Sequence, residues 1–192
     1  MKVMGMVLEP TYIWHDGGTG GRTNANGDPI IAPARPSNQD RHTLGGRAVK
    51  KFAAGGARVD ATVEGYYQFG EIGAGAGGKN LDIEAWAFHI DGGVTLPVPM
   101  QPRLSAEFNT ASGDEDPNDG KYQGFDQLYP TNHIHFGYMD RMSWKNMDHL
   151  AVGLQMRPTA DSHFEVTGHF LSLREAGDQL YHAGQALSLI HI

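Results

Sequence analysis

An acidic stretch, residues 112–120, holds the side chains of this chain that are best suited to binding a metal ion. Its sequence is SGDEDPNDG, which places four carboxylates within six residues. Calcium prefers carboxylate oxygens, so Asp114, Asp116 and Asp119 are candidate ligands of a structural Ca²⁺ ion. The spacing is not that of an EF-hand, because Asp119 stands where that loop requires glycine. A solvated acidic turn is the alternative, and the sequence favours it.

His133 and His135 form a second pair of candidate ligands, on one side of an extended segment. Zinc takes three or four ligands in proteins, and no third histidine or carboxylate follows at a diagnostic spacing. The favoured interpretation is therefore that these histidines form hydrogen bonds within a loop.

Arginines are the residues of this chain most suited to binding an anion. Arg47, Arg103 and Arg157 fall on the polar sides of strand-like segments, where Glu107 and Asn109 share the side of Arg103. A guanidinium binds carboxylates through two parallel hydrogen bonds, and arginines that line a pore select anions. We expect these five residues to line a lumen through which an acidic polymer passes. The alternative, given equal weight, is that each arginine pairs with a nearby carboxylate and only stabilises the wall.

The elements that position these side chains are β-strands. In residues 147–157, Leu150, Val152 and Leu154 alternate with polar or small residues, which is typical of a strand with one apolar and one wet side. Similar alternation predicts seven strands, each about as long as a tilted strand needs to cross a bilayer. Their approximate ranges are 1–13, 42–50, 58–70, 81–96, 103–110, 147–157 and 163–174. For residues 81–96 the pattern leaves open which side faces outward.

The connections between these strands alternate between long and short. The long ones cover about residues 14–39, 71–80 and 112–146, and the short ones about 51–56, 97–102 and 158–162. Tight turns at one end and long loops at the other are typical of an antiparallel, up-and-down transmembrane β-barrel. A soluble β-sandwich shows the same alternation along its strands, but its connections mix long and short lengths. The loop pattern therefore favours the barrel.

Composition excludes several other classes. Among 192 residues, 26 glycines argue against a helical bundle, and no apolar run reaches the ~18 residues of a transmembrane helix. The net charge of −7 argues against nucleic acid as a partner. The absence of cysteine removes disulfides and thiol chemistry. No nucleophile motif is present, and we expect the protein not to be an enzyme.

A family resemblance appears between residues 105 and 140. The segments ASGD, DPNDGK, FDQLYPTNH and GYMD follow one another there. This succession resembles the signature region of the alginate export family, a group of outer-membrane β-barrel porins of Gram-negative bacteria. The likeness extends over about residues 40–182.

The resemblance implies a barrel of about 18 strands with a basic lumen. Residues 1–192 would then form a partial barrel domain, about seven strands of a larger barrel without its N-terminal and C-terminal strands. Residues 14–39 and 112–146 would be long extracellular loops. The resemblance supports the lumen role for Arg47, Arg103 and Arg157, and it suggests that the loop at 112–146 folds into the pore as a gate.

The function expected is an outer-membrane channel for passive export or diffusion of an anionic, alginate-like polysaccharide or related acidic solutes. Its partners would be that polysaccharide, outer-membrane lipid and periplasmic export proteins. No cofactor is expected apart from the calcium considered above. The alternative function is a soluble carbohydrate-binding β-sandwich, in which Trp86, Tyr66, Tyr67 and Trp144 would stack on sugars.

Overall fold

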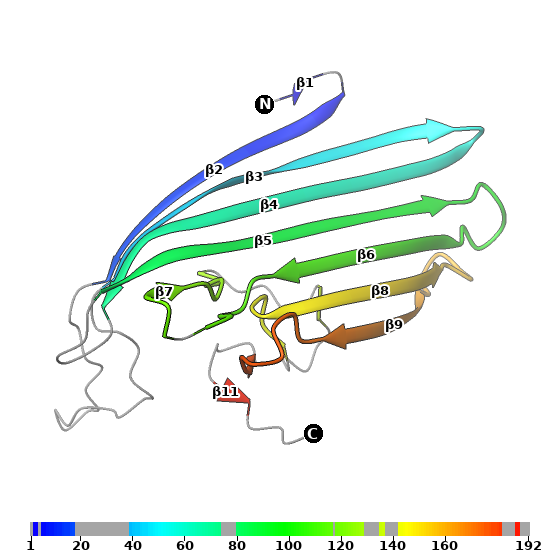
Figure 1. Ribbon diagram of the computed structural model, residues 1–192. Helices are drawn as coiled ribbons and strands as arrows, with labels where there is room; N and C mark the ends of the chain where they lie inside the picture. The colour runs from blue at the N-terminus through cyan, green and yellow to red at the C-terminus, as the bar shows by residue number, and fades with distance from the viewer. Residues whose placement is uncertain are drawn as a thin grey trace, which may run out of the picture.

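Seven long antiparallel strands form one curved sheet in the computed structural model of the chain (Figure 1). The structure describes residues 2–3, 5–17, 39–73, 80–116, 118–128, 135–136, 142–181 and 187–188. The long strands are β2 (Met6–Gly17), β3 (Gln39–Ala54), β4 (Ala57–Gly73), β5 (Asn80–Thr95), β6 (Arg103–Ala111), β8 (Met147–Met156) and β9 (Phe164–Ser172). The short strands are β1 (Lys2–Val3), β7 (Lys121–Tyr122), β10 (Leu180–Tyr181) and β11 (Leu187–Ser188).

The strands follow one another across the sheet in the order β1-β2-β3-β4-β5-β6-β8-β9. β7 lies outside this path and pairs in parallel with the start of β5. The up-and-down, antiparallel, all-β fold is thus confirmed, and all seven expected strands are present. Within the described residues the sheet is open, because β1 and β9 lie at opposite edges. No described helix is long and apolar enough to span a membrane.

Several strands extend further than the sequence pattern indicated. β3 continues to Ala54, and the turn to β4 is made by Gly55 and Gly56 alone, with φ of 57° and 85°. Two consecutive positive φ angles define the two-residue turn whose twist matches that of antiparallel strands, and glycine adopts them without strain. At the other end of the sheet β2 reaches Gly17 and β3 begins at Gln39, so the first long connection covers less than 14–39. Residues 18–38 of that connection lie outside the described residues.

One side of the sheet, here called the apolar face, carries large exposed side chains. Cross-strand register aligns them in rows, because paired residues in antiparallel strands point to the same side. One row contains Val63, Ile90, Phe108, Leu150 and Phe170, all of them exposed. Soluble proteins rarely expose apolar patches of this extent, whereas the outer surface of a membrane barrel consists of them.

The opposite side, here called the polar face, carries most of the buried side chains of the sheet. The structure decides the orientation of β5, which the sequence left open. Ile83, Ala85 and Ala87 are buried on the polar face, while Phe88 and Ile90 lie exposed on the apolar face. The middle strands of the polar face are buried because residues of the connection between β6 and β8 lie on them. This connection, residues 112–146, is called the β6–β8 loop below.

Candidate functional site

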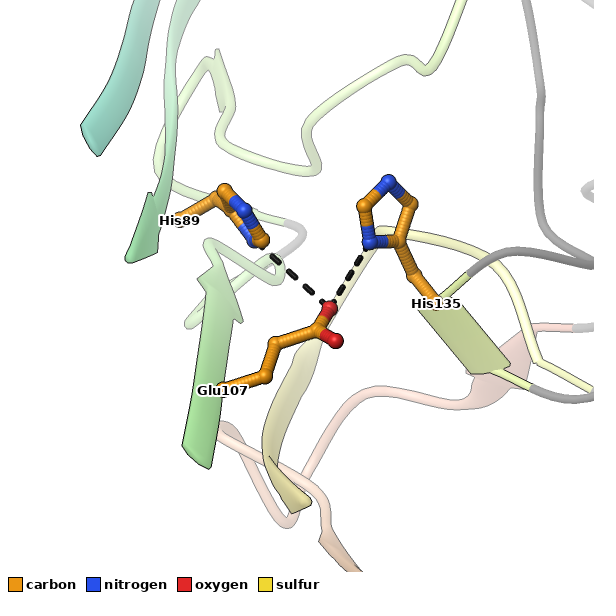
Figure 2. A group of neighbouring side chains, drawn as sticks. All are labelled: His89, Glu107 and His135. Atoms are coloured by element: carbon orange, nitrogen blue, oxygen red, sulfur yellow. Dashed lines mark hydrogen bonds and ion pairs between the residues drawn. The ribbon is translucent and has the colours of Figure 1, made fainter. Parts of the chain in front are cut away.

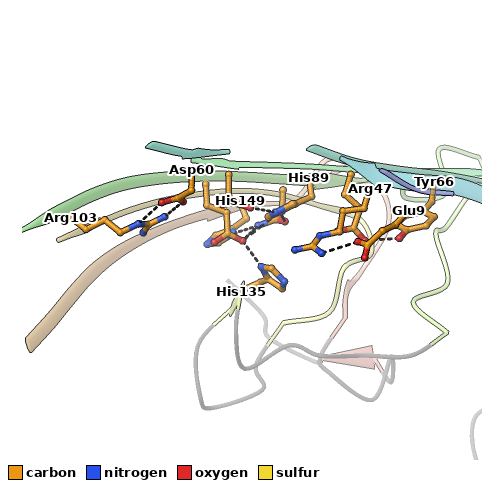
Figure 3. A network of polar contacts seen from close by, with 12 residues as sticks. Glu9, Arg47, Asp60, Tyr66, His89, Arg103, His135 and His149 are labelled. Atoms are coloured by element: carbon orange, nitrogen blue, oxygen red, sulfur yellow. Dashed lines mark hydrogen bonds and ion pairs between the residues drawn. The ribbon is translucent and has the colours of Figure 1, made fainter. Parts of the chain in front are cut away.

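A row of polar side chains crosses six strands in the middle of the polar face. Register aligns its members, which are Glu9, Arg47, Glu64, His89, Asn109 and His149. Figure 3 shows that its labelled members project from the same side of the sheet. Arg47 Nη1 donates to Glu9 Oε2 at 3.0 Å, and Nε lies 3.9 Å from Glu64 Oε2. The arginine of this row is therefore held between two carboxylates.

The histidine end of this row is a continuous hydrogen-bonded chain. His89 Nδ1 lies 2.6 Å from Asn109 Oδ1, and Asn109 Nδ2 lies 3.0 Å from His149 Nδ1. His149 Nε2 in turn lies 2.9 Å from His169 Nδ1 on β9. His89, Asn109 and His149 are almost completely buried. Buried polar groups are tolerated when each has a partner, and this chain supplies one to each ring.

Arg103 lies closer to the end of the sheet that carries the short turns. Its guanidinium passes directly over Gly93, where any side chain would collide with it, and reaches Asp60 two strands away. Nη2 donates to Asp60 Oδ2 at 2.5 Å, and Nε donates to Oδ1 at 3.2 Å. This bidentate pair fixes the guanidinium flat against the wall.

The β6–β8 loop binds to the sheet through an aromatic contact. Phe125 is only 4% exposed and packs on Ala85, Ala87 and Ala111 of β5 and β6. Trp144, near the end of the loop, packs edge-on against Phe125 with ring centroids 5.6 Å apart. The alanines are small enough to leave room for these rings close to the backbone of the sheet.

A polar contact beside this cluster attaches the loop to β4. Gln68 donates from Nε2 to the backbone oxygen of Asp126 at 2.8 Å, and its Oε1 accepts from the backbone nitrogen of Asp126 at 2.9 Å. Arg41 donates from Nη1 to the same Oε1 at 2.7 Å, and its Nε lies 3.9 Å from Asp126 Oδ2. Gln68 therefore binds the loop backbone as a neighbouring strand would, and buried Arg41 fixes its amide.

A cavity of about 220 Å³ remains between the loop and the polar face. Its wall side includes Thr43, Glu64, His89 and Asn109, and its loop side includes Phe125, Leu128, His135 and Phe136. The cavity therefore lies along the polar row, where carboxylate, imidazole and amide groups are available to a solute. This geometry can provide a cavity in which a solute is hydrogen-bonded.

The sequence of the chain agrees with this architecture when it is compared with known families. The sequence model of the family described as alginate export matches residues 2–188. The chain belongs to the alginate export family. Neither the curated proteins nor the solved structures contain a significant match. Members of the alginate export family are β-barrel porins of the outer membrane that transport a polysaccharide, and the open antiparallel sheet is consistent with a part of such a barrel.

Of the five residues predicted to line the lumen, four project from the polar face and the fifth, Arg157, lies in a turn. Arg47, Arg103, Glu107 and Asn109 project from the polar face, and both arginines pair with carboxylates, as the alternative interpretation anticipated. Arg157 was wrongly assigned to a strand. β8 ends at Met156, and Arg157 lies exposed in the turn before Pro158, with its backbone nitrogen bonded to Met100 O at 2.7 Å.

The acidic stretch forms turns and also contacts the segment after β9. Asp116 accepts from the backbone of Asn118 at 2.9 Å, and Asp119 accepts from that of Lys121 at 2.8 Å, as in ordinary polar turns. Asp114 differs, since its buried Oδ1 has no hydrogen-bond partner among the described residues and its backbone nitrogen donates to Asp178 Oδ2 at 2.9 Å. Burial and the charges of Asp178 and Asp119 raise the pKa of Asp114. Calcium at Asp114, Asp116 and Asp119 stays a prediction.

The spacing of His133 and His135 along the sequence gave little information about what these two histidines contact. His133 lies outside the described residues, but His135 Nδ1 contacts Glu107 Oε1 at 2.8 Å, and its ring centroid lies 5.0 Å from that of His89. Spacing along the sequence could not reveal further ligands for His135, because His89 and Glu107 come from strands that are distant in sequence. The sequence did contain one indication of this group: His89 and Glu107 lie on adjacent predicted strands, where their side chains could come close together.

Proposed function

We propose that this chain forms part of the wall of a passive channel through which an anionic, alginate-like polysaccharide crosses the outer membrane. The observation that carries the proposal is the separation of the two faces: one presents bare apolar rows, and the other presents hydrogen-bonding and charged groups around a cavity. A lipid-facing surface and a wet lumen require this separation.

The positions of the arginines support an anionic solute. Arg58 and Arg103 both pair in register with Thr95 and project from the polar face at the short-turn end, and Arg157 lies in the adjacent turn. In outer-membrane barrels the short turns face the periplasm. A polymer leaving the periplasm would meet these cations first. Pairing with Asp60 occupies only part of the donor set of Arg103, because a guanidinium carries five N–H groups.

The β6–β8 loop supports a channel whose width can change. It binds the polar face through Phe125 and Gln68, which leave a cavity between loop and wall. We propose that movement of this loop away from the polar face opens the passage. Deletion of residues 124–139 should then raise single-channel conductance.

The soluble sandwich is a weaker candidate. A β-sandwich packs a second sheet on its apolar face, whereas the described residues place no second layer on the row that contains Ile90 and Phe108. Two of the aromatic residues assigned to sugar stacking make other contacts here. Trp144 packs against Phe125, and the ring of Trp86 lies under the Arg174 guanidinium, with Cζ 4.5 Å from the ring centroid.

The arginines can be tested by ion selectivity in planar bilayers. Arg103→Glu and Arg157→Glu should each shift the reversal potential in a salt gradient toward cation preference, because each replaces a positive charge at the entrance with a negative one. Lys50→Glu is the matched control. Lys50 is near the same end but lies on the apolar face beside Phe52, so it should leave selectivity unchanged. An unchanged reversal potential in both arginine variants would remove the anion-selective role.

A further inference from the structure

His89, Glu107 and His135 bring three potential metal ligands together where the loop meets the wall. Figure 2 shows the two rings and the carboxylate converging, from β5, β6 and the β6–β8 loop. Their ligand atoms all lie within 4.8 Å of one another. Glu107 Oε1 is 2.8 Å from His135 Nδ1 and 3.7 Å from His89 Nδ1. Atoms that share a tetrahedral zinc ion at ~2.0–2.1 Å are about 3.3–3.5 Å apart, so small shifts would suffice.

We propose that these three residues bind one Zn²⁺ ion, or another first-row transition-metal ion of similar preference. Two imidazoles and a carboxylate form a ligand set typical of zinc sites, whereas Ca²⁺ and Mg²⁺ prefer oxygen ligands throughout. His89 and His135 also both line the cavity between the loop and the polar face, from which an ion could reach them.

The surroundings of His89 give independent support. Its Nε2 lies 2.9 Å from Asp91 Oδ2, which leaves Nδ1 facing Glu107. Metal-binding histidines usually donate their second ring N–H to a carboxylate, which fixes the tautomer and orients the ring. Nδ1 donates to Asn109 Oδ1 at 2.6 Å, so a bound ion would replace both the Nδ1 proton and this contact.

The site would connect the loop to the wall. Two ligands belong to strands of the sheet and the third belongs to the loop, so an ion bound by all three would hold the loop on the polar face. This consequence rests on the proposed function, since it matters only if loop movement opens a channel. The metal site itself does not depend on that proposal.

Metal binding can be measured without any transport assay. The full chain, purified in detergent without a histidine tag, would be titrated with Co²⁺, whose visible absorption becomes intense in a tetrahedral site. We expect about one equivalent of Co²⁺ to bind per chain, and we expect Zn²⁺ to displace it. His135→Ala and Glu107→Gln should weaken Co²⁺ binding at least tenfold. The control is His163→Ala, which should leave binding unchanged, because His163 is exposed beside Glu165 in the β8–β9 turn. Unchanged circular dichroism would show that the variants are folded.

Two results would overturn the site: absence of tetrahedral Co²⁺ bands, or equal affinity in wild type and His135→Ala. A conductance measurement with Zn²⁺ then tests the connection to the loop. Zn²⁺ should lower wild-type conductance and leave His135→Ala unchanged. If Co²⁺ binds as expected and Zn²⁺ has no effect on conductance, the loop-holding role is wrong. If the metal-free protein conducts no ions, the proposed function fails while the titration still decides the metal site.

Discussion

Phe125 and Phe170 show how differently the two faces of the sheet are satisfied. Phe125 is 4% exposed, because it packs on alanines of the polar face, whereas Phe170 on the apolar face is 64% exposed. Both faces belong to the same strands and alternate at the same spacing. The polar face is covered by the chain itself, through the β6–β8 loop, and the described residues leave the apolar face bare.

Under the proposed function, this difference indicates which face would meet lipid. Exposed apolar side chains such as Leu150 and Val152 are unfavourable in water and favourable in hydrocarbon. The polar face would be unfavourable in hydrocarbon, because Arg47, His89 and their partners would be transferred there with their charges. The proposed function therefore assigns the sheet one orientation in a membrane, with the loop on the side of the lumen.

The largest expected effect removes the aromatic contact of the loop. Phe125→Ala leaves a cavity against Ala85 and Ala87 and should weaken loop attachment by about 3–5 kcal/mol, the usual cost for a buried phenylalanine. Limited proteolysis of the loop should become much faster, and conductance should rise. Phe170→Ala, on the bare face, is the matched control and should leave loop proteolysis unchanged. Equal protection of the loop in Phe125→Ala and wild type would contradict this docking.

An intermediate effect distinguishes two adjacent residues of β9. Val166 lies on the apolar face and Thr167 on the polar face. Val166→Arg should destabilise the membrane-inserted protein by about 2–4 kcal/mol if it lies near the middle of the bilayer, and less near the interface. Thr167→Arg, beside Glu165, should cost much less. Reversible urea unfolding in lipid vesicles measures both, and equal losses would mean that the two faces meet the same solvent.

The smallest effect concerns the acidic stretch. The raised pKa of Asp114 means that its ionised form, which is partly buried and lies beside Asp178, is unfavourable in the folded protein. Stability should therefore fall as pH rises from the ordinary pKa of aspartate through the raised value, and the penalty should persist at neutral pH. Asp114→Asn should raise the melting temperature at pH 7 and lose this advantage in acid.

Asp161→Asn in an exposed turn is the control for that change and should be neutral. The same measurement separates the two interpretations of the acidic stretch. A calcium ion held by Asp114 would reverse the result in millimolar Ca²⁺, because wild type would then be more stable than Asp114→Asn.

The strands and the polar character of one face could be predicted from local alternation, which depends only on the pleat. The orientation of β5 could not, since Ala85 and Ala87 are apolar residues on the polar face. They are apolar because they receive Phe125, a contact made across almost forty positions of sequence.

The group formed by His89, Glu107 and His135 could not be predicted either, because its contacts join residues that are distant in sequence. His135 acquires its partners only when the loop folds back onto β5 and β6, so its spacing from His133 carried no information about them. Arg157 was misplaced for a local reason. Its backbone nitrogen bonds to Met100 in the neighbouring turn, and Pro158 follows it, so the strand ends one residue earlier than alternation suggested.

The central claim, that lipid contacts one face and water the other, can be tested directly because the chain contains no cysteine. Single cysteines at Leu104, Val152 and Val166, and at their neighbours Ser105, Gly153 and Thr167, would carry nitroxide spin labels in lipid vesicles. We predict that labels in the first group are relaxed by oxygen dissolved in the bilayer, and those in the second by a water-soluble nickel chelate. Water accessibility at all six positions would contradict the account.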